Sequence, residues 1–313
     1  MHRQSEFILV TGGAGFIGSH TVERLLDSGH RVRVLDNLSS GREENLPLGH
    51  PGLELIPGDV TSPEDVEQAM QGMDRILHLA AQVSVEKSVQ QPVESCRQNI
   101  LGFVQVIDAA VRHGVQRMVF ASSAAVYGNP RRLPIEESHP LGPISPYGLE
   151  KQVNEEYATL FRDLHGLSVM GLRYFNVYGP RQDPGSPYAG VISIFASRMS
   201  QRKSITIYGD GRQTRDFVYV GDVARANEAS LFCGFEGVCN IASGRSISLL
   251  DLVDELAEIL GRVPVRFDAP RDGDIRESQA SVSRMQEVLR LGSMISTKDG
   301  LEALLGSEAP SKA

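Results

Sequence analysis

Residues 7–18 read FILVTGGAGFIG, an apolar run followed by a glycine-rich turn, and the helical pattern of residues 19–28 comes directly after them. Glycines three residues apart permit a tight turn and a close approach of the backbone to a ligand. The start of the following helix presents free N–H groups and the positive end of the helix dipole. This order of strand, glycine turn and helix predicts a dinucleotide site whose pyrophosphate contacts Gly12, Gly15, Phe16, Ile17 and Gly18.

The first 170 residues alternate short apolar runs with helical patterns, as expected for parallel strands joined by crossover helices. The expected strands are Phe7–Val10, Arg31–Leu35, Leu53–Pro57, Arg75–Leu79, Arg117–Ala121 and Ser168–Leu172. Continuous apolar runs, rather than strict alternation, indicate a sheet that is covered on both faces. We therefore predict an α/β fold with a doubly wound, Rossmann-like parallel sheet.

The regular alternation weakens beyond about residue 176, and this change predicts a division of the chain. We expect a dinucleotide-binding domain over residues 1–175. Residues 176–313 are expected to form mainly a smaller substrate-binding lobe, which could also return strands to the main sheet. Within this lobe, an apolar stripe over residues 248–260 predicts a packing helix that begins after Ser248 and ends at Gly261.

The composition excludes several classes of protein. Of the 313 residues, 41% are hydrophobic and 22% are charged, which is typical of a globular chain and unlike collagen, coiled coils or mucins. The net charge of -8 disfavours nucleic acid as a partner. No stretch approaches the roughly 20 apolar residues of a membrane span. Three cysteines without metal-ligand spacing fit a reducing compartment, so we expect a cytoplasmic protein with no metal site and no membrane partner.

The end of the second expected strand carries Asp36, which lies 18 residues beyond Gly18. A carboxylate at this place can accept hydrogen bonds from both hydroxyls of an adenosine ribose, and it would repel a 2′-phosphate. We therefore expect NAD rather than NADP as the cofactor. Three arginines that are near in the sequence could loosen this preference: Arg31, Arg33 and Arg42.

Two further positions belong to the same predicted cofactor site. Asn37 follows Asp36, and the pair Asp59 and Val60 follows the third expected strand, where it can meet the adenine. A turn that caps the next helix explains the spacing of Asp59 equally well.

The glycine spacing G-x-x-G-x-x-G departs from that of the classical dehydrogenases and points to a family. Together with Leu79-Ala80-Ala81, Asn99, Ser122-Ser123 and Tyr147-x-x-x-Lys151, it resembles the extended short-chain dehydrogenase/reductase family over nearly the whole chain. The resemblance implies that Asn99 bends a helix. It also implies that the cofactor site includes Leu79, Ala80, Ala81, Asn99, Tyr147, Lys151 and Tyr174.

Tyr147 and Lys151 lie one turn apart on one face of a helix that is expected to begin at Pro146. A phenol with a reference pKa of about 10 must shift by roughly 3 units, or about 4 kcal/mol, to act as a base near pH 7. The ammonium of Lys151 and a nicotinamide cation can favour the phenolate. Ser123, at the end of the fifth expected strand, can bridge substrate and tyrosine. A solvated helix face explains a lone Tyr-x-x-x-Lys better, but the glycine turn and Ser123 favour catalysis.

Ala124 and Ala125 discriminate among the sugar-nucleotide members of this family. The related dehydratases carry Asp-Glu at these positions and the decarboxylases carry Glu at the second. The chain resembles the UDP-hexose 4-epimerases, which implies that Tyr147 takes the proton of the 4-hydroxyl with help from Ser123. The resemblance further implies oxidation of C4 by NAD, rotation of the 4-keto sugar and reduction on its other face.

The same resemblance implies a substrate site for a UDP-sugar. Asn176 meets the diphosphate, two arginines clamp it, an aspartate binds the ribose, and a gate residue faces the C2 substituent of the sugar. The residues implied are Ser84, Ser123, Asn176, Gly190, Val191, Thr206, Tyr208, Arg215, Arg271, Asp274 and Ser278. Ser278 is the gate, and because serine is small it favours UDP-N-acetylglucosamine and UDP-N-acetylgalactosamine, with UDP-glucose and UDP-galactose as further candidates.

Two other interpretations remain open from the sequence. The first is a nucleotide-sugar reductase or dehydratase that releases a keto product, and the second is an NAD-binding scaffold without activity. The family resemblance also implies a homodimer with a four-helix interface built from residues 98–111 and 147–161.

Overall fold

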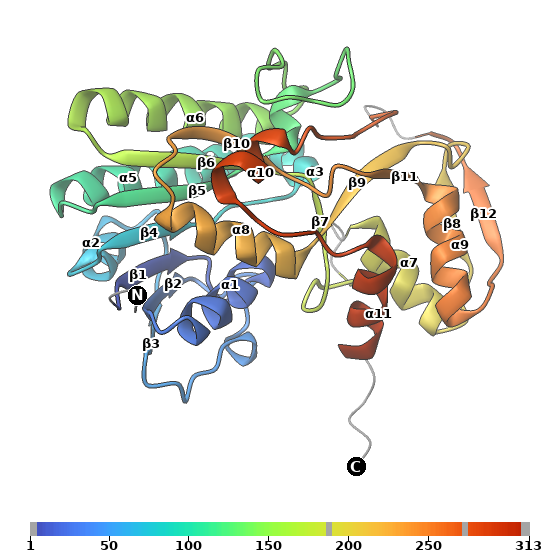
Figure 1. Ribbon diagram of the computed structural model, residues 1–313, viewed down its shortest axis with the longest axis horizontal. Helices are drawn as coiled ribbons and strands as arrows, with labels where there is room; N and C mark the ends of the chain where they lie inside the picture. The colour runs from blue at the N-terminus through green and yellow to red at the C-terminus, as the bar shows by residue number, and fades with distance from the viewer. Residues whose placement is uncertain (1–4, 186–189, 271–274, 308–313) are drawn as a thin grey trace.

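A seven-stranded sheet in the order β10-β6-β5-β4-β1-β2-β3 forms the centre of the computed structural model, which describes residues 5–185, 190–270 and 275–307 (Figure 1). Every neighbouring pair in this sheet is parallel. The strands are β1 (Phe7–Thr11), β2 (Arg31–Asp36), β3 (Leu53–Pro57), β4 (Arg75–His78), β5 (Arg117–Ser123), β6 (Ser168–Tyr174) and β10 (Gly237–Ile241). The predicted α/β fold and its six strands are confirmed, while β10 is a returning strand of the kind considered for residues 176–313 whose position was not predicted.

Helices cover both faces of the sheet because successive side chains of each strand point to opposite faces. On β1, Ile8 and Val10 belong to one apolar cluster and Leu9 belongs to the other. The first cluster includes side chains of α1 (Phe16–Asp27), α8 (Val220–Phe232) and α10 (Ser283–Leu289). The second includes side chains of α2 (Pro63–Met70), α5 (Gly102–Arg112) and α6 (Pro146–His165). The sheet is therefore doubly wound.

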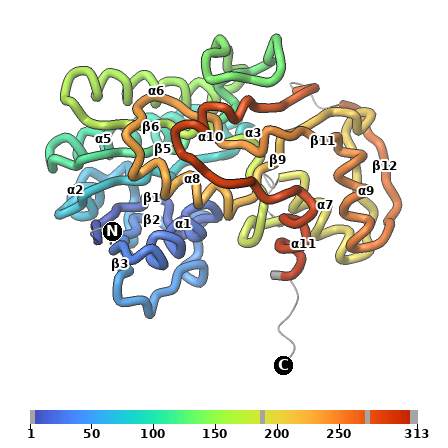
Figure 2. The backbone as a smooth tube through the Cα atoms, in the orientation of Figure 1, coloured from blue at the N-terminus to red at the C-terminus, as the bar shows by residue number. Residues whose placement is uncertain are grey.

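The C-terminal half of the chain contributes to two places (Figures 1 and 2). The strand β10 belongs to the main sheet and the helices α8 and α10 lie against it, whereas the remaining elements form a smaller lobe with its own apolar cluster. The lobe contains α7 (Val191–Ser200), α9 (Leu249–Leu260), α11 (Thr297–Ser307), and the strands β7 (Asn176–Tyr178), β8 (Ile205–Tyr208), β9 (Thr214–Tyr219), β11 (Ser246–Ser248) and β12 (Val265–Asp268). The assignment of cofactor binding to residues 1–175 and of substrate binding to residues 176–313 stays a prediction.

Local sequence signals set the ends of two helices. Ser248 caps α9 in a reciprocal capping box with Asp251, and the helix ends at Gly261, where φ is 81°. The helix predicted over this stretch is confirmed. At α6, Pro146 takes the first helical position and the hydroxyl of Ser145 accepts a hydrogen bond from the N–H of Gly148.

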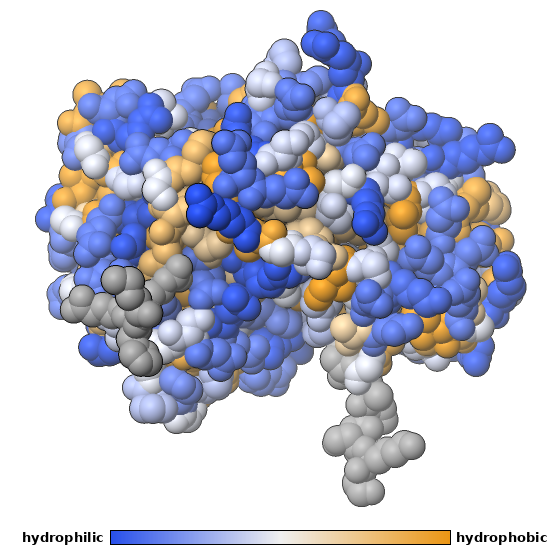
Figure 3. Space-filling view, viewed as in Figure 1, coloured by the Kyte–Doolittle hydropathy of each residue, from blue (hydrophilic) through white to orange (hydrophobic). Residues whose placement is uncertain are grey.

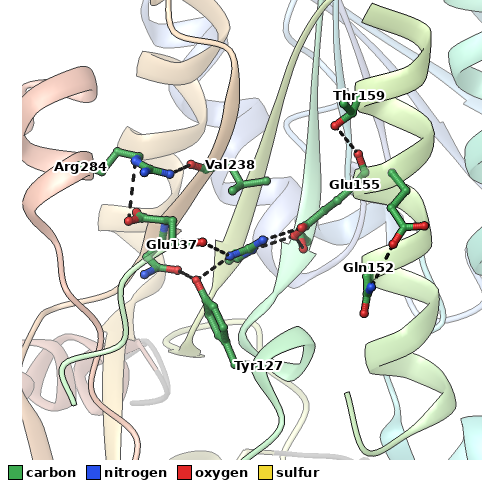
Figure 4. A network of polar contacts seen from close by, with 11 residues as sticks. Tyr127, Glu137, Gln152, Glu155, Thr159, Val238 and Arg284 are labelled. Carbon is green, nitrogen blue, oxygen red and sulfur yellow. Dashed lines mark hydrogen bonds and ion pairs between the residues drawn. The ribbon is translucent and has the colours of Figure 1, made fainter. Parts of the chain in front are cut away.

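A buried polar network fixes α6 against the sheet (Figure 4). Arg173 of β6 forms a two-pronged ion pair with Glu155 of α6, at 2.6 Å and 2.8 Å. Ser122 of β5 donates to the same carboxylate at 2.5 Å, and Arg173 donates to the hydroxyl of Tyr127 at 2.8 Å. Because both ions are almost completely buried, α6 has one strongly preferred position on β5 and β6.

The surface is mostly hydrophilic on the face that Figure 3 shows, with small hydrophobic patches, one of them over the smaller lobe. None of the helices in the described part of the chain is long and apolar enough to cross a membrane.

We expect replacement of Gly18 by alanine to lower the free energy of unfolding by about 1–3 kcal/mol, the usual cost of overpacking a fitted site. A Cβ atom at this position would lie 2.2 Å from the carbonyl oxygen of Gly12 and 2.7 Å from Cα of Gly13. The matched control is Gly49→Ala, because a Cβ there meets no atom within 4 Å. Chemical denaturation of the three proteins measures the difference, and equal stability of both variants would contradict the packing argument.

Candidate active site

The glycine turn between β1 and α1 has no room for a side chain at Gly12 or Gly18. Gly12 has φ of 69°, and a Cβ on it would lie 2.7 Å from the backbone nitrogen of Ala80. Gly15 precedes the helix in extended conformation, and no side chain caps the helix. The N–H groups of the first helical turn, which begins with Phe16 and Ile17, have no partners within α1. The free N–H groups attract the negative charge of a dinucleotide pyrophosphate, and the glycines let it approach the backbone closely.

Asp36 is held beside this turn at the end of β2. Its Oδ2 accepts a hydrogen bond from the N–H of Ala14 and its Oδ1 accepts one from the N–H of Leu38, both at 2.9 Å. The side chain is buried. Because each carboxylate oxygen can accept a further hydrogen bond, Asp36 can also bind two ribose hydroxyls.

Asn37 and Asp59 lie together at the ends of neighbouring strands. The Nδ2 of Asn37 donates to Asp59 Oδ2 at 2.9 Å, and the N–H of Thr61 donates to Asp59 Oδ1 at 2.8 Å. Burial raises the pKa of Asp59, but these hydrogen bonds outweigh it, and the pKa lies below its ordinary value. Val60 is buried. Ser62 is the N-cap of α2, and Asp59 forms the turn that leads into this cap, because its carbonyl accepts a hydrogen bond from the N–H of Ser62 at 2.9 Å. The contact of Asp59 with a cofactor stays a prediction.

Ser123, Tyr147 and Lys151 come together where β5 meets the start of α6. The Nζ of Lys151 donates to the carbonyl oxygen of Ala121 at 3.0 Å and lies 5.8 Å from the centre of the Tyr147 ring. Burial lowers the pKa of Lys151 to about 8, against the effect of the Glu150 carboxylate. Burial raises the pKa of Tyr147, while a hydrogen bond from Ser123 opposes this rise.

The loop after β4 packs against the glycine turn. The backbone N–H of Leu79 donates to the carbonyl of Thr11 at 3.0 Å, and that of Ala80 donates to the Thr11 hydroxyl at 3.2 Å. The same hydroxyl lies 2.8 Å from Nδ1 of His78. Burial and the charge of Lys151 lower the pKa of His78 to about 3, so this ring is neutral near pH 7. Sequence reasoning missed Thr11 and His78, although both are polar residues at the ends of adjacent parallel strands.

Asn99 lies in the π-helical turn Arg97–Leu101, where the resemblance implied a bend in a helix. Its side chain forms two hydrogen bonds with the backbone of Gln82, at 2.8 Å and 2.9 Å, and thereby holds the loop that follows Ala81. Tyr174 ends β6, and its hydroxyl donates to Oδ1 of Asn227 of α8 at 2.7 Å. Contacts of Asn99 and Tyr174 with a cofactor stay predictions.

The residues predicted for substrate binding are spread over both parts of the fold. Ser84 is buried and caps the helix α3 (Val85–Gln90), and Gly190 and Val191 are the cap and first residue of α7. Thr206 and Tyr208 lie on β8. These placements leave their predicted roles untested.

The phosphate-binding prediction concerns Asn176 of β7 and Arg215 of β9. The Nδ2 of Asn176 donates to the carbonyl of Asp216 at 3.1 Å, and Arg215 donates to the carbonyl of Ile275 at 2.6 Å. The other two predicted residues, Arg271 and Asp274, lie outside the described residues.

Asp216 is a buried carboxylate that sequence reasoning missed. It accepts hydrogen bonds from the N–H and the hydroxyl of Ser243, and from the N–H groups of Gly244 and Ala280, at 2.7–3.1 Å. Burial raises the pKa of Asp216 to about 6, although these hydrogen bonds lower it. Ala280 is two residues from Ser278, which is also buried, so Asp216 holds the segment of the predicted gate against β9.

No group of three or more metal-ligating side chains occurs within residues 5–185, 190–270 and 275–307.

Comparisons with known proteins show the family of the chain. The sequence model of the NAD dependent epimerase/dehydratase family matches residues 8–237. A UDP-glucose 4-epimerase of Mycolicibacterium smegmatis is 38% identical over 304 residues, which are 94% of this chain and 95% of that protein.

Two solved structures are similar over almost their whole length. A UDP-N-acetylglucosamine 4-epimerase from Methanobrevibacter ruminantium, in complex with UDP-N-acetylmuramic acid, has a TM-score of 0.92 and 37% identity, and the match covers 97% of this chain and 98% of that one. A UDP-glucose 4-epimerase of Thermus thermophilus in complex with NAD has a TM-score of 0.89 and 38% identity, with 96% and 98% covered.

We expect Asp36→Ala to weaken NAD binding by about 1–3 kcal/mol, the range of charge-assisted hydrogen bonds, and to narrow the difference between NAD and NADP. Asp27→Ala is the matched control, because it removes the same charge from an exposed position at the end of α1. Isothermal titration with both dinucleotides measures the effect. Tighter binding of NADP than of NAD by the unchanged protein would contradict the assignment.

Proposed function

The chain belongs to the NAD dependent epimerase/dehydratase family, and we propose that it interconverts UDP-N-acetylglucosamine and UDP-N-acetylgalactosamine at C4, with UDP-glucose and UDP-galactose as further substrates. The observation that carries the proposed chemistry is the meeting of Ser123, Tyr147 and Lys151 at the edge of the sheet that also holds the glycine turn.

The cofactor of this family is NAD, and the residues present fit it. The side-chain-free turn at Gly12, Gly15 and Gly18 accommodates the pyrophosphate, and Asp36 accommodates the adenosine ribose. When bound, NAD would supply the acceptor for the hydride on C4 of the sugar, that is its hydrogen with two electrons, and the donor for the return of this hydride.

The protein supplies the movement of one proton. Tyr147 accepts the proton of the 4-hydroxyl and returns it when C4 is reduced, with Ser123 aligning the oxygen through its hydrogen bond to the phenol. Burial favours the neutral phenol, so a cation is needed to make Tyr147 a base. With its pKa at about 8, Lys151 is mainly protonated near pH 7, and it supplies that cation.

Ala124 and Ala125 support epimerisation over dehydration. They begin the 3₁₀ turn Ala124–Tyr127 that follows directly on Ser123, and neither can supply the extra acid and base that loss of water needs. The expected product is therefore an isomer of the substrate, formed without net reduction of the cofactor.

Ser278 supports an acetamido sugar as the preferred substrate. It is small and buried in a segment that Asp216 holds through Ala280. The relatives described above act on either UDP-glucose or UDP-N-acetylglucosamine according to their names, so the preference of this chain rests on Ser278 alone.

A homodimer is part of the proposal. Apolar side chains are exposed along α3, the following helix α4 (Pro92–Cys96), the π-helical turn and α6, and three of them, Leu101, Leu149 and Leu160, lie within the residues 98–111 and 147–161 expected at the interface. These side chains are Val85, Val89, Val93, Leu101, Leu149, Leu160 and Leu164, with Val93 84% exposed. Burial of such a surface against a second copy removes apolar area from water.

We expect Tyr147→Phe to keep the fold and NAD binding but to lose about 10²- to 10⁴-fold in turnover, the usual contribution of general acid–base catalysis. Ser123→Ala should lose turnover to a smaller extent. The control is Tyr157→Phe, which removes a hydroxyl from a partly buried tyrosine on the same helix.

The assay incubates the purified protein with UDP-N-acetylglucosamine, identifies the nucleotide sugar by NMR and follows the absorbance of reduced cofactor. An isomeric product without net reduction is the expected result. Accumulation of reduced cofactor or of a keto sugar would point to a reductase or dehydratase instead. Absence of turnover with every UDP-sugar tested would favour a scaffold.

We expect Ser278→Tyr to lower kcat/KM for UDP-N-acetylglucosamine by roughly 5- to 150-fold, the equivalent of about 1–3 kcal/mol of overpacking. UDP-glucose carries only a hydroxyl at C2, so the kcat/KM for UDP-glucose should stay the same. Ser283→Tyr, at an exposed serine on α10, is the control. An unchanged ratio of the two kcat/KM values would mean that another residue sets the pocket.

A further inference from the structure

A carboxylate without a part in the proposed reaction lies directly beside the catalytic residues. Glu150 precedes Lys151 on α6, and only 3% of its surface is exposed. Its Oε2 accepts hydrogen bonds from Nδ2 of Asn99 at 2.6 Å and from the hydroxyl of Ser95 at 2.8 Å. A carboxylate this deeply buried needs partners, and both of these are neutral donors.

The direction of both hydrogen bonds is fixed by Gln82. Its backbone N–H can only donate, and it donates to Oδ1 of Asn99, so the other end of that amide must face Glu150 as a donor. The side chain of Gln82 donates to the oxygen of Ser95, so the hydroxyl proton of Ser95 points to Glu150. Two donors converge on one oxygen, and hydrogen bonds from such donors are stronger to a carboxylate than to a neutral carboxyl group.

Glu150 thereby joins four elements. Its helix α6 carries Tyr147 and Lys151, while Ser95 belongs to α4 and Asn99 to the π-helical turn. Through Asn99 the connection extends to the loop after β4, which continues from Ala81 to Gln82. This loop contains the positions predicted to meet cofactor and substrate.

The negative charge of Glu150 raises the pKa of both Lys151 and Tyr147. Burial lowers the pKa of Lys151 and the carboxylate raises it, while burial and the carboxylate both raise the pKa of Tyr147. The nearby His78 is neutral. The charged side chains of the neighbouring helices and of the π-helical turn are at least partly exposed to solvent, namely Glu86, Lys87, Glu94, Arg97, Asp108 and Arg112. Solvent screens those charges, whereas it screens the buried pair of Glu150 and Lys151 much less.

We propose that Glu150 is a positioning residue of this site, whose buried carboxylate keeps the proton on Lys151 and fixes the loop after β4 through Asn99. The inference rests on the proposed roles of Tyr147 and Lys151. It adds that the pH range of the reaction is set by a charge that never touches the substrate.

Glu150→Gln tests the charge separately from the geometry. Glutamine keeps a carbonyl oxygen that can accept the hydrogen bonds of Asn99 and Ser95, but it carries no charge. Without that charge the pKa values of Tyr147 and Lys151 both fall. We therefore expect both limbs of the kcat/KM profile against pH to move to lower pH by about one unit, as for neighbouring charges of a partly dry site.

Two variants serve as controls. Glu156→Gln removes the same charge from an exposed position on the same helix, where its partner is Gln152, and both limbs should stay in place. Glu150→Asp keeps the charge on a shorter side chain, so the rate can fall while the limbs stay. If Glu150→Gln lowers the rate or the stability without moving either limb, the residue is merely structural and the proposal is overturned.

A titration without substrate separates this inference from the proposed function. The ultraviolet absorbance of the Tyr147 phenolate is obtained by subtracting the signal of Tyr147→Phe, with and without Glu150→Gln. We expect the phenolate to form about one pH unit lower in the glutamine variant, whether or not the protein turns over any sugar. An unmoved titration overturns the proposal.

The unchanged protein offers a second measurement in case Glu150→Gln does not fold. Isotope-edited NMR of the glutamate carboxylates, with Glu150→Asp to assign the signal, reports the ionisation of Glu150 directly. An ionised carboxylate at neutral pH is expected, and a protonated one overturns the proposal.

Discussion

The buried ion pair between Arg173 and Glu155 fixes the helix on which the rest of the site depends. Taking both ions out of water is costly, so the pair is favourable only with its geometry intact, and loss of one partner typically costs about 3–5 kcal/mol. Ser122 donates a further hydrogen bond to Glu155, and Tyr127 and the carbonyl of Glu137 accept further hydrogen bonds from Arg173. A helix held in this way cannot slide along the sheet by small steps, and its first turn stays at the end of β5, beside Ser123.

The burial of Tyr147 and Lys151 has one effect that favours catalysis and one that opposes it. The same exclusion of water that strengthens hydrogen bonds favours neutral Tyr147 and neutral Lys151, whereas the proposed chemistry needs an ammonium beside a phenol that can ionise. Fixed neighbours decide the balance. The carbonyl of Ala121 accepts from the ammonium, and Glu150 adds a negative charge that solvent screens weakly. A few contacts that exclude water therefore determine the protonation states of Tyr147 and Lys151.

How much of the fold and of the site can be predicted from the sequence depends on how far apart in the chain the interacting residues are. Apolar runs and caps are local, so the strands of the first half and the helix after Ser248 follow from the sequence. The position of the strand β10 was not predicted, because its short segment becomes a strand by pairing with residues of β6 that lie 67 positions earlier in the chain. The contact between Asn99 and Glu150, 51 residues apart, was missed because each residue alone is an ordinary polar side chain of a helix.

Asp216 shows why such a residue is difficult to replace in the smaller lobe. Its pKa is raised from 3.8 to about 6, so the folded protein binds the proton more tightly than the unfolded chain, and stability falls by about 3 kcal/mol as pH rises through this interval. An asparagine would avoid that cost, but its amide would turn two hydrogens toward donors from Ser243, Gly244 and Ala280. A carboxylate can accept all of them. The buried charge of Asp216 is unfavourable by itself, but only a carboxylate can hold β9, the loop at Ser243 and the segment of Ser278 together in one arrangement.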